Sequence, residues 1–153
     1  ITDHINWSGF NPLIGINVDA YGPRFNDMSD GYHKKYRDQL IKTANKINQK
    51  VYEGIYCMYS GPNFETPAEI NALKVIGGNA VGMSTIPEVL VANHCGLPVI
   101  AISVITNLAA GMNKTKLSHQ ETLENAALAE NNIINLIKNY IHDVKLDDPS
   151  GNN

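Results

Sequence analysis

Residues 99–105 read VIAISVI and form the stretch of this 153-residue chain that most constrains its fold. Apolar, mostly β-branched side chains occupy both odd and even positions, a pattern typical of a strand covered on both faces. Two more strands are predicted at 54–60 and 80–82, with segments of helical periodicity between and after them. Alternating strands and helices predict an α/β layered sheet. Three strands are few for such a sheet, so we expect the chain to be part of a larger unit.

Three of the predicted helices begin at capping boxes, in which a hydroxyl side chain is followed three residues later by a glutamate. The pairs are Thr66 with Glu69, Thr85 with Glu88, and Ser118 with Glu121. The last of these helices is expected to end near residue 144, and an additional helix is expected at about 30–48. The first 29 residues are rich in Gly, Pro, Asn and Asp, which predicts a long ordered loop or an insert.

Composition and charge exclude several classes of partner. The formal net charge is −3, and the 12 Lys and Arg residues are scattered, so no basic stripe for polymeric nucleic acid is expected. No apolar run approaches the roughly 20 residues that span a bilayer, and the N-terminus lacks a signal pattern. We therefore expect a soluble cytoplasmic protein. Cys57 and Cys95 lack CxxC spacing and a neighbouring His cluster, so two reduced, buried thiols and no metal site are expected.

Side chains with binding chemistry follow the predicted strands, where open α/β sheets bind ligands. They are Phe64 and Glu65 after 54–60, Met83 and Ser84 after 80–82, and Asn107 after 99–105. Each has an ordinary structural explanation when taken alone. Phe64 suits the edge of a core, Glu65 suits a helix N-terminus, and Asn107 suits a turn. Only their combination favours a ligand site.

Five segments of the sequence resemble one enzyme family, the trimeric purine nucleoside phosphorylases. They are TDHIN at 2–6, GPRFNDMS at 22–29, YSGPNFETPAEI at 59–70, AVGMSTIPEVLVANHCGLPV at 80–99 and ITN at 105–107. The resemblance extends over nearly all of the chain to about residue 130. It implies part of a mixed β-sheet flanked by helices, in the phosphorylase/hydrolase-like nucleoside phosphorylase fold.

The resemblance also implies roles for individual residues. Glu65 and Asn107 would hold the purine, Phe64 would stack on the nucleoside, Met83 would meet the ribose 2′-hydroxyl, Tyr56 would lie near the ribose, His119 would meet the 5′-hydroxyl and Ser84 would be one phosphate ligand. Phe25 matches the aromatic that the family inserts into a neighbouring subunit's site, which implies a homotrimer with composite sites. His119 alone, one residue past an N-cap, would be an ordinary solvated histidine.

The implied reaction is phosphorolysis of 6-oxopurine nucleosides such as inosine and guanosine, without metal or organic cofactor and with phosphate as co-substrate. An ionised Glu65 accepts hydrogen bonds only, so it can take the N1–H of a 6-oxopurine. Asn107 can donate to N7 and O6 as negative charge moves onto the departing base. Glu65 and Asn107 are therefore the candidate catalytic residues.

One departure from the family pattern limits this interpretation. Family subunits are nearly twice as long, and their first half supplies a glycine-rich phosphate loop, a histidine and an arginine that this sequence lacks. We expect residues 1–153 to be the C-terminal portion of one phosphorylase domain, with poor phosphate binding and little turnover alone. Three alternatives remain: a methylthioadenosine phosphorylase, whose relatives carry an acidic residue where Asn107 stands; a nucleoside-binding fragment without catalysis; and an ordinary interaction domain.

Overall fold

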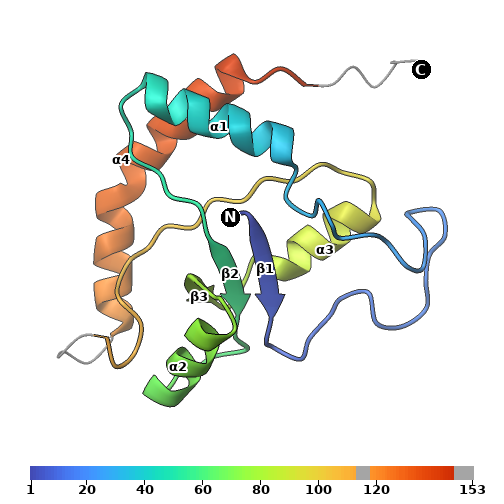
Figure 1. Ribbon diagram of the computed structural model, residues 1–153, viewed down its shortest axis with the longest axis horizontal. Helices are drawn as coiled ribbons and strands as arrows, with labels where there is room; N and C mark the ends of the chain where they lie inside the picture. The colour runs from blue at the N-terminus through green and yellow to red at the C-terminus, as the bar shows by residue number, and fades with distance from the viewer. Residues whose placement is uncertain (113–117, 147–153) are drawn as a thin grey trace.

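The computed structural model describes residues 1–112 and 118–146. Its elements, in chain order, are β1 (Asp3–Asn6), α1 (Lys34–Lys46), β2 (Ile55–Met58), α2 (Pro67–Val75), β3 (Ala80–Gly82), α3 (Ile86–His94) and α4 (His119–Asp143). Figure 1 shows the small sheet at the centre, with α2 and α3 close to it, α1 beyond the N-terminal ends of the strands and α4 along the left side of the view. The α/β class predicted from the sequence is confirmed.

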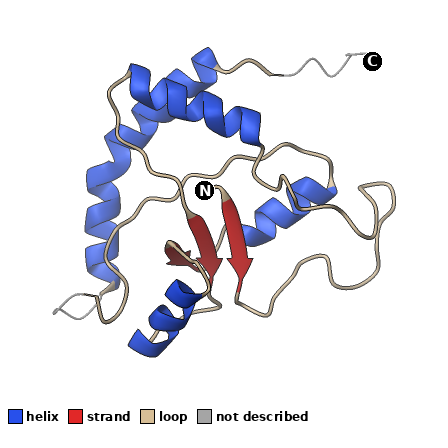
Figure 2. Cartoon of the chain, in the orientation of Figure 1, coloured by secondary structure: helices blue, strands red, loops and turns tan. Residues whose placement is uncertain are grey.

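The sheet is built from three parallel strands in the order β1-β2-β3 (Figure 2). The described strands all run in one direction, which agrees with the expected part of a larger mixed sheet. Each connection between neighbouring strands is a crossover that includes a helix, which is what parallel pairing requires. Because the strands are parallel, the loops that follow them emerge at one edge.

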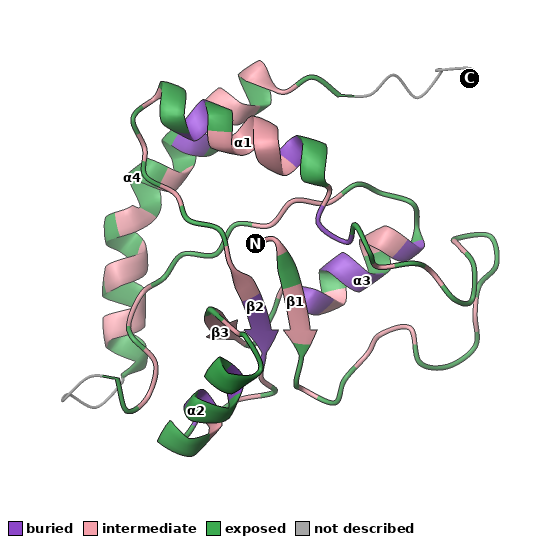
Figure 3. Ribbon diagram, viewed as in Figure 1, coloured by how far each residue is buried: buried purple, intermediate pink, exposed green. Residues whose placement is uncertain are grey.

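Alternation along β2 separates two cores. Tyr56 and Met58 face one side of the sheet, where they pack against Ile86 and Leu90 of α3. Cys57 faces the other side, where the cluster of Ile70 and Leu73 of α2 covers it. Figure 3 shows buried residues along β2 and on the inner surfaces of the two helices. The sheet is therefore sandwiched between α2 and α3.

The start of α2 is the capping box predicted from the sequence. Thr66 Oγ1 accepts from the backbone N–H of Glu69 at 3.3 Å, and Glu69 Oε2 accepts from the N–H of Thr66 at 2.7 Å. The Tyr59 hydroxyl donates to Glu69 Oε1 at 3.0 Å. These hydrogen bonds, from Thr66 first, lower the pKa of the Glu69 carboxyl. The same hydrogen bonds hold the loop between β2 and α2 at the end that adjoins α2.

Of the other two predicted capping boxes, the one at Thr85 is absent, and the one at Ser118 keeps the side-chain cap of Ser118. Thr85 precedes α3, but its side chain makes no capping hydrogen bond, so that prediction was wrong. Its backbone has φ 76°, outside the extended conformation usual at an N-cap, and its hydroxyl lies 3.3 Å from Ser84 Oγ. Ser118 does cap α4, because its hydroxyl accepts from the N–H of Glu121 at 3.1 Å.

Helices α1 and α4 contact each other along one side of the molecule. Lys46 Nζ pairs with Asp143 Oδ2 at 2.7 Å, and Gln39 exchanges two hydrogen bonds with the backbone of Lys145. Leu136 of α4 is fully buried. Even α4, the longest described helix, lacks the apolar character needed to cross a bilayer.

Two segments have a different structure from the one predicted. Residues 3–6 were predicted to be part of a loop but form β1. Their mostly polar sequence does not indicate a strand, and the pairing with β2 makes them one. Residues 99–105 were predicted to be a strand covered on both faces, yet they form no strand. Ile102, Val104 and Ile105 are 39%, 37% and 66% exposed. Backbone groups of 102–105 find no hydrogen-bond partner in the described part of the chain, and pairing is what makes an extended segment a strand.

The two cysteines also differ from each other. Cys57 is buried in the sheet, as predicted, and burial raises the pKa of its thiol. Cys95 lies at the end of α3 and is exposed, so the prediction of two buried thiols holds for Cys57 only. Neither cysteine is in a disulfide.

Candidate functional site

A cavity of about 810 Å³ lies at the edge of the sheet where β2 and β3 end. Its walls come from the loop after β2, from β3 and the residue after it, from α2, from residues 103–109 and from the start of α4. Five of the predicted site residues line it: Phe64, Glu65, Met83, Asn107 and His119. The structure thus brings these five side chains together, and the roles predicted for them stay predictions.

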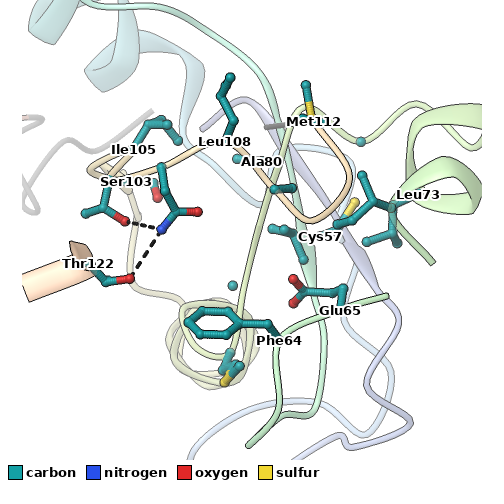
Figure 4. Close-up of a pocket in the computed structure, with 18 of the residues that line it drawn as sticks. Cys57, Phe64, Glu65, Leu73, Ala80, Ser103, Ile105, Leu108, Met112 and Thr122 are labelled. Carbon is teal, nitrogen blue, oxygen red and sulfur yellow. Dashed lines mark hydrogen bonds between the residues drawn. The ribbon is translucent and has the colours of Figure 1, made fainter. Parts of the chain in front are cut away.

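Glu65 is the most buried polar side chain of the cavity, with 7% of its surface exposed. Figure 4 shows its carboxylate directed into the cavity, beside the ring of Phe64. No hydrogen-bond donor among the described residues reaches this carboxylate, whose oxygens are open to the cavity. An acceptor of this kind is left for a ligand that carries N–H groups.

The local chain path explains how Phe64 and Glu65 reach the cavity. Gly61 has φ 62°, a conformation that favours glycine, and a Cβ at this position would collide with Met83 Sδ. The loop therefore packs tightly against Met83 before it turns toward α2. Thr66 then caps the helix, which fixes the position of Glu65 as the residue before this cap.

Asn107 is held by hydroxyl groups on two sides. Its Nδ2 donates to Thr106 Oγ1 at 3.1 Å and to Thr122 Oγ1 at 3.2 Å. The carbonyl oxygen of Thr106 accepts from Asn125 Nδ2 at 2.6 Å. Two side chains of α4 thereby fasten residues 106–107, and Figure 4 shows Thr122 at this wall of the cavity.

Three predicted residues do not line this cavity. Tyr56 is 3% exposed and packs on the α3 side of the sheet, with its hydroxyl 3.5 Å from the backbone N of Ser84. Ser84 is exposed beside Met83. Phe25 is 90% exposed in the loop between β1 and α1. The roles predicted for Tyr56, Ser84 and Phe25 remain predictions.

Thr122 and Asn125 are site residues that the sequence reasoning missed. Thr122 lines the cavity one turn after His119, and Asn125 follows after another three residues. Residues three apart share one face of a helix. That spacing from His119 was the signal that would have found both side chains.

A second cavity, of about 420 Å³, lies between the sheet and the α1 and α4 pair. Five residues line both cavities: Asn79, Ala80, Ser103, Val104 and Ile105. The two cavities thus meet between β3 and residues 103–105. We call this opening the β3 cleft.

The described residues contain no group of three or more His, Cys, Asp or Glu side chains arranged to hold a metal ion. The polar groups that line the larger cavity are instead a carboxylate, the ammonium group of Lys74, amides, hydroxyls and one imidazole. Such a set suits an organic ligand with several hydrogen-bonding edges.

Residues 1–142 match the family model described as Phosphorylase superfamily. The chain belongs to the phosphorylase superfamily. The superfamily assignment confirms the resemblance seen in the sequence, and the cavity lies in the part of the chain that the family model matches.

Individual proteins of the phosphorylase superfamily are similar to this chain over most of its length. Purine nucleoside phosphorylase 1 of Geobacillus stearothermophilus is 46% identical over 144 residues, which are 94% of this chain and 53% of that protein. Crystal structures of Schistosoma mansoni purine nucleoside phosphorylase with adenosine and with inosine superpose with TM-scores of 0.90 and 0.89, at 35% and 36% identity. Each match covers 95% of this chain, and 55% and 54% of those chains. The chain therefore spans about half the length of the relatives it matches.

Proposed function

We propose that this chain carries the nucleoside-binding part of a purine nucleoside phosphorylase for 6-oxopurine ribonucleosides and deoxyribonucleosides such as inosine and guanosine. The observation that carries the proposal is the meeting of Phe64, Glu65 and Asn107 in one cavity. Its support from relatives is the 46% identity to the Geobacillus stearothermophilus enzyme.

Each part of a nucleoside has a group to receive it in this proposal. The Phe64 ring stacks on the nucleoside, a type of contact worth about 1–3 kcal/mol in nucleic-acid sites. Glu65 accepts the N1–H of the base, and Asn107 binds at the N7 and O6 edge. Met83 and His119 meet the ribose hydroxyls. All five side chains line the same cavity, which supports the assignment.

The proposed reaction is attack of a phosphate oxygen on C1′ of the nucleoside. The C1′–O bond forms as the C1′–N9 bond breaks, and the bonding electron pair leaves with the purine, which is then protonated. The products are the free base and (deoxy)ribose 1-phosphate. Glu65 and Asn107 promote the reaction by binding the departing base more tightly than the ground-state nucleoside. Inorganic phosphate is the co-substrate, and no metal or organic cofactor takes part.

We assign most of the phosphate site to the part of the relatives that this chain does not span, with Ser84 as one ligand. The β3 cleft supports this division, because it leaves apolar side chains and backbone groups of residues 102–105 open beside β3. A polypeptide corresponding to the other half of the relatives would cover them. Alone, the chain binds nucleoside and turns it over poorly.

We further propose a cytoplasmic homotrimer in which Phe25 completes a neighbouring subunit's site. Exposed apolar side chains are concentrated in the loop that follows β1, and such concentrations mark interaction surfaces. They are Trp7, Phe10, Ile14, Ile16, Val18, Tyr21 and Phe25.

Isothermal titration calorimetry of the 153-residue chain with hypoxanthine tests the binding proposal directly. We expect one site per chain. The half of the Geobacillus stearothermophilus enzyme that this chain does not span is then produced separately and added, and phosphate-dependent conversion of inosine to hypoxanthine is followed, with a control lacking phosphate. Absence of hypoxanthine binding would overturn the proposal. Binding without turnover in the mixture would favour a nucleoside-binding fragment.

A further inference from the structure

The side-chain amide of Asn107 presents its carbonyl oxygen, rather than its nitrogen, to a ligand. An amide has two N–H donors. Those of Asn107 are engaged by Thr106 Oγ1 at 3.1 Å and Thr122 Oγ1 at 3.2 Å. Its Oδ1 accepts no hydrogen bond from the residues that the structure describes. Because Asn107 lines the large cavity, this oxygen is the polar atom left for the ligand.

The hydroxyl of Thr122 fixes that orientation. Its single proton is donated to the carbonyl oxygen of Ser118, 3.2 Å away in the first turn of α4. The lone pairs of Oγ1 are therefore what Asn107 meets. If the amide turned over, its oxygen would face another acceptor unless Thr122 gave up its hydrogen bond to Ser118.

We propose that Thr122 is a positioning residue for Asn107, which holds the amide oxygen toward the cavity and thereby selects bases with a hydrogen on N7. This inference rests on the proposed function above. The hydrogen bond from Asn125 to the carbonyl oxygen of Thr106, at 2.6 Å, adds a second attachment of α4 to the same segment. The orientation of the amide is thus set by α4 and not by the loop alone.

The chemistry of the base follows from two acceptors. The Glu65 carboxylate and Asn107 Oδ1 both accept hydrogen bonds, so the ligand must offer N–H at both places. A 6-oxopurine with hydrogens on N1 and N7 does so, whereas N7 of the intact nucleoside carries a lone pair. The site accordingly favours the protonated departing base over the nucleoside. This arrangement replaces the donation to N7 and O6 that we expected for Asn107 from the sequence.

Two analogues of hypoxanthine separate this role from simple packing. 9-Deazahypoxanthine carries a fixed N–H at ring position 7, and 7-deazahypoxanthine carries a C–H there. The dissociation constants of both are measured by titration calorimetry for the wild type and for Thr122→Val, Thr122→Ala and Thr122→Ser. We expect the wild type to prefer the N–H analogue at least tenfold. That preference should fall at least fivefold in Thr122→Val and Thr122→Ala and should be retained in Thr122→Ser, which keeps the hydroxyl.

The ratio of the two dissociation constants decides the outcome. Circular dichroism and the thermal unfolding midpoint establish that each variant is folded, and Thr122→Ala replaces Thr122→Val if valine prevents folding. An unchanged ratio in the variant without a hydroxyl overturns the positioning role, even if both affinities fall together. Equal binding of the two analogues by the wild type overturns it as well and leaves the nucleoside site standing. A wild type that binds neither analogue overturns the proposed function.

Discussion

Replacing Glu65 by alanine should weaken purine binding without destabilising the protein. The carboxylate is buried and has no donor among the described residues, so it contributes little to folding. A hydrogen bond to a charged acceptor is worth about 1.5–3 kcal/mol. Glu65→Ala should therefore cost about 2 kcal/mol of hypoxanthine binding, or about thirtyfold in the dissociation constant. Its free energy of unfolding should be unchanged or higher by up to about 1 kcal/mol.

Glu69→Ala is the matched control, four residues further along the chain. Glu69 completes the capping box with Thr66 and accepts from Tyr59. Its loss should lower the midpoint of urea unfolding and leave hypoxanthine affinity at wild-type level when measured well below that midpoint. Titration calorimetry and urea unfolding are run on both variants. The reasoning fails if Glu65→Ala lowers the free energy of unfolding as well, or if its affinity for hypoxanthine falls less than tenfold.

Three other perturbations test different parts of the molecule. Asn107→Asp removes the NH₂ group that Thr106 and Thr122 hold, so the carboxylate can turn both oxygens toward the base and accept from the 6-amino group of adenine. The ratio of adenine to hypoxanthine affinity should shift toward adenine, and an unchanged ratio would remove Asn107 from the base site. Burial lowers the pKa of His4 from its ordinary value of 6.5. The contribution of His4 to the free energy of unfolding is therefore complete above pH 6.5 and declines as the pH falls toward the lowered pKa. In His4→Gln, the free energy of unfolding should change less with pH over that range. A Cβ at Gly82 would collide with Tyr56 Oη, so Gly82→Ala should cost about 1–3 kcal/mol in urea unfolding, and adding Tyr56→Phe should recover part of it; no recovery would exclude this contact as the cause.

The sequence predicted best those features that depend on nearby residues. The capping box of Thr66 and Glu69 needs only two suitable residues three positions apart, and it is present as predicted. Thr85 with Glu88 has the same spacing, but its hydroxyl does not cap because the backbone at Thr85 adopts a positive φ. Phe64 and Glu65 follow β2 and Met83 follows β3, so their meeting was predictable because parallel strands place their following loops at one edge.

Features that depend on distant partners were predicted less well. The pattern at 99–105 predicts a strand that is buried on both faces. A strand also needs hydrogen-bond partners for its backbone, and the described residues supply none to 102–105. The reverse holds for β1, where pairing with β2 makes a strand from a short polar sequence. Thr122 shares a helix face with His119, but its contact with Asn107 could not be predicted, because the two residues are brought together only by the docking of α4.

The β3 cleft affects how the isolated chain can be handled. Within the described residues β3 pairs with β2 alone, so one of its edges has unpaired backbone groups, and the exposed Ile102, Val104 and Ile105 lie in the segment that lines the cleft with it. Open strand edges next to apolar side chains are templates for aggregation. Colloidal stability, rather than unfolding, should limit the concentration at which the chain can be stored. Solubility should therefore rise when a polypeptide that covers the cleft is co-expressed.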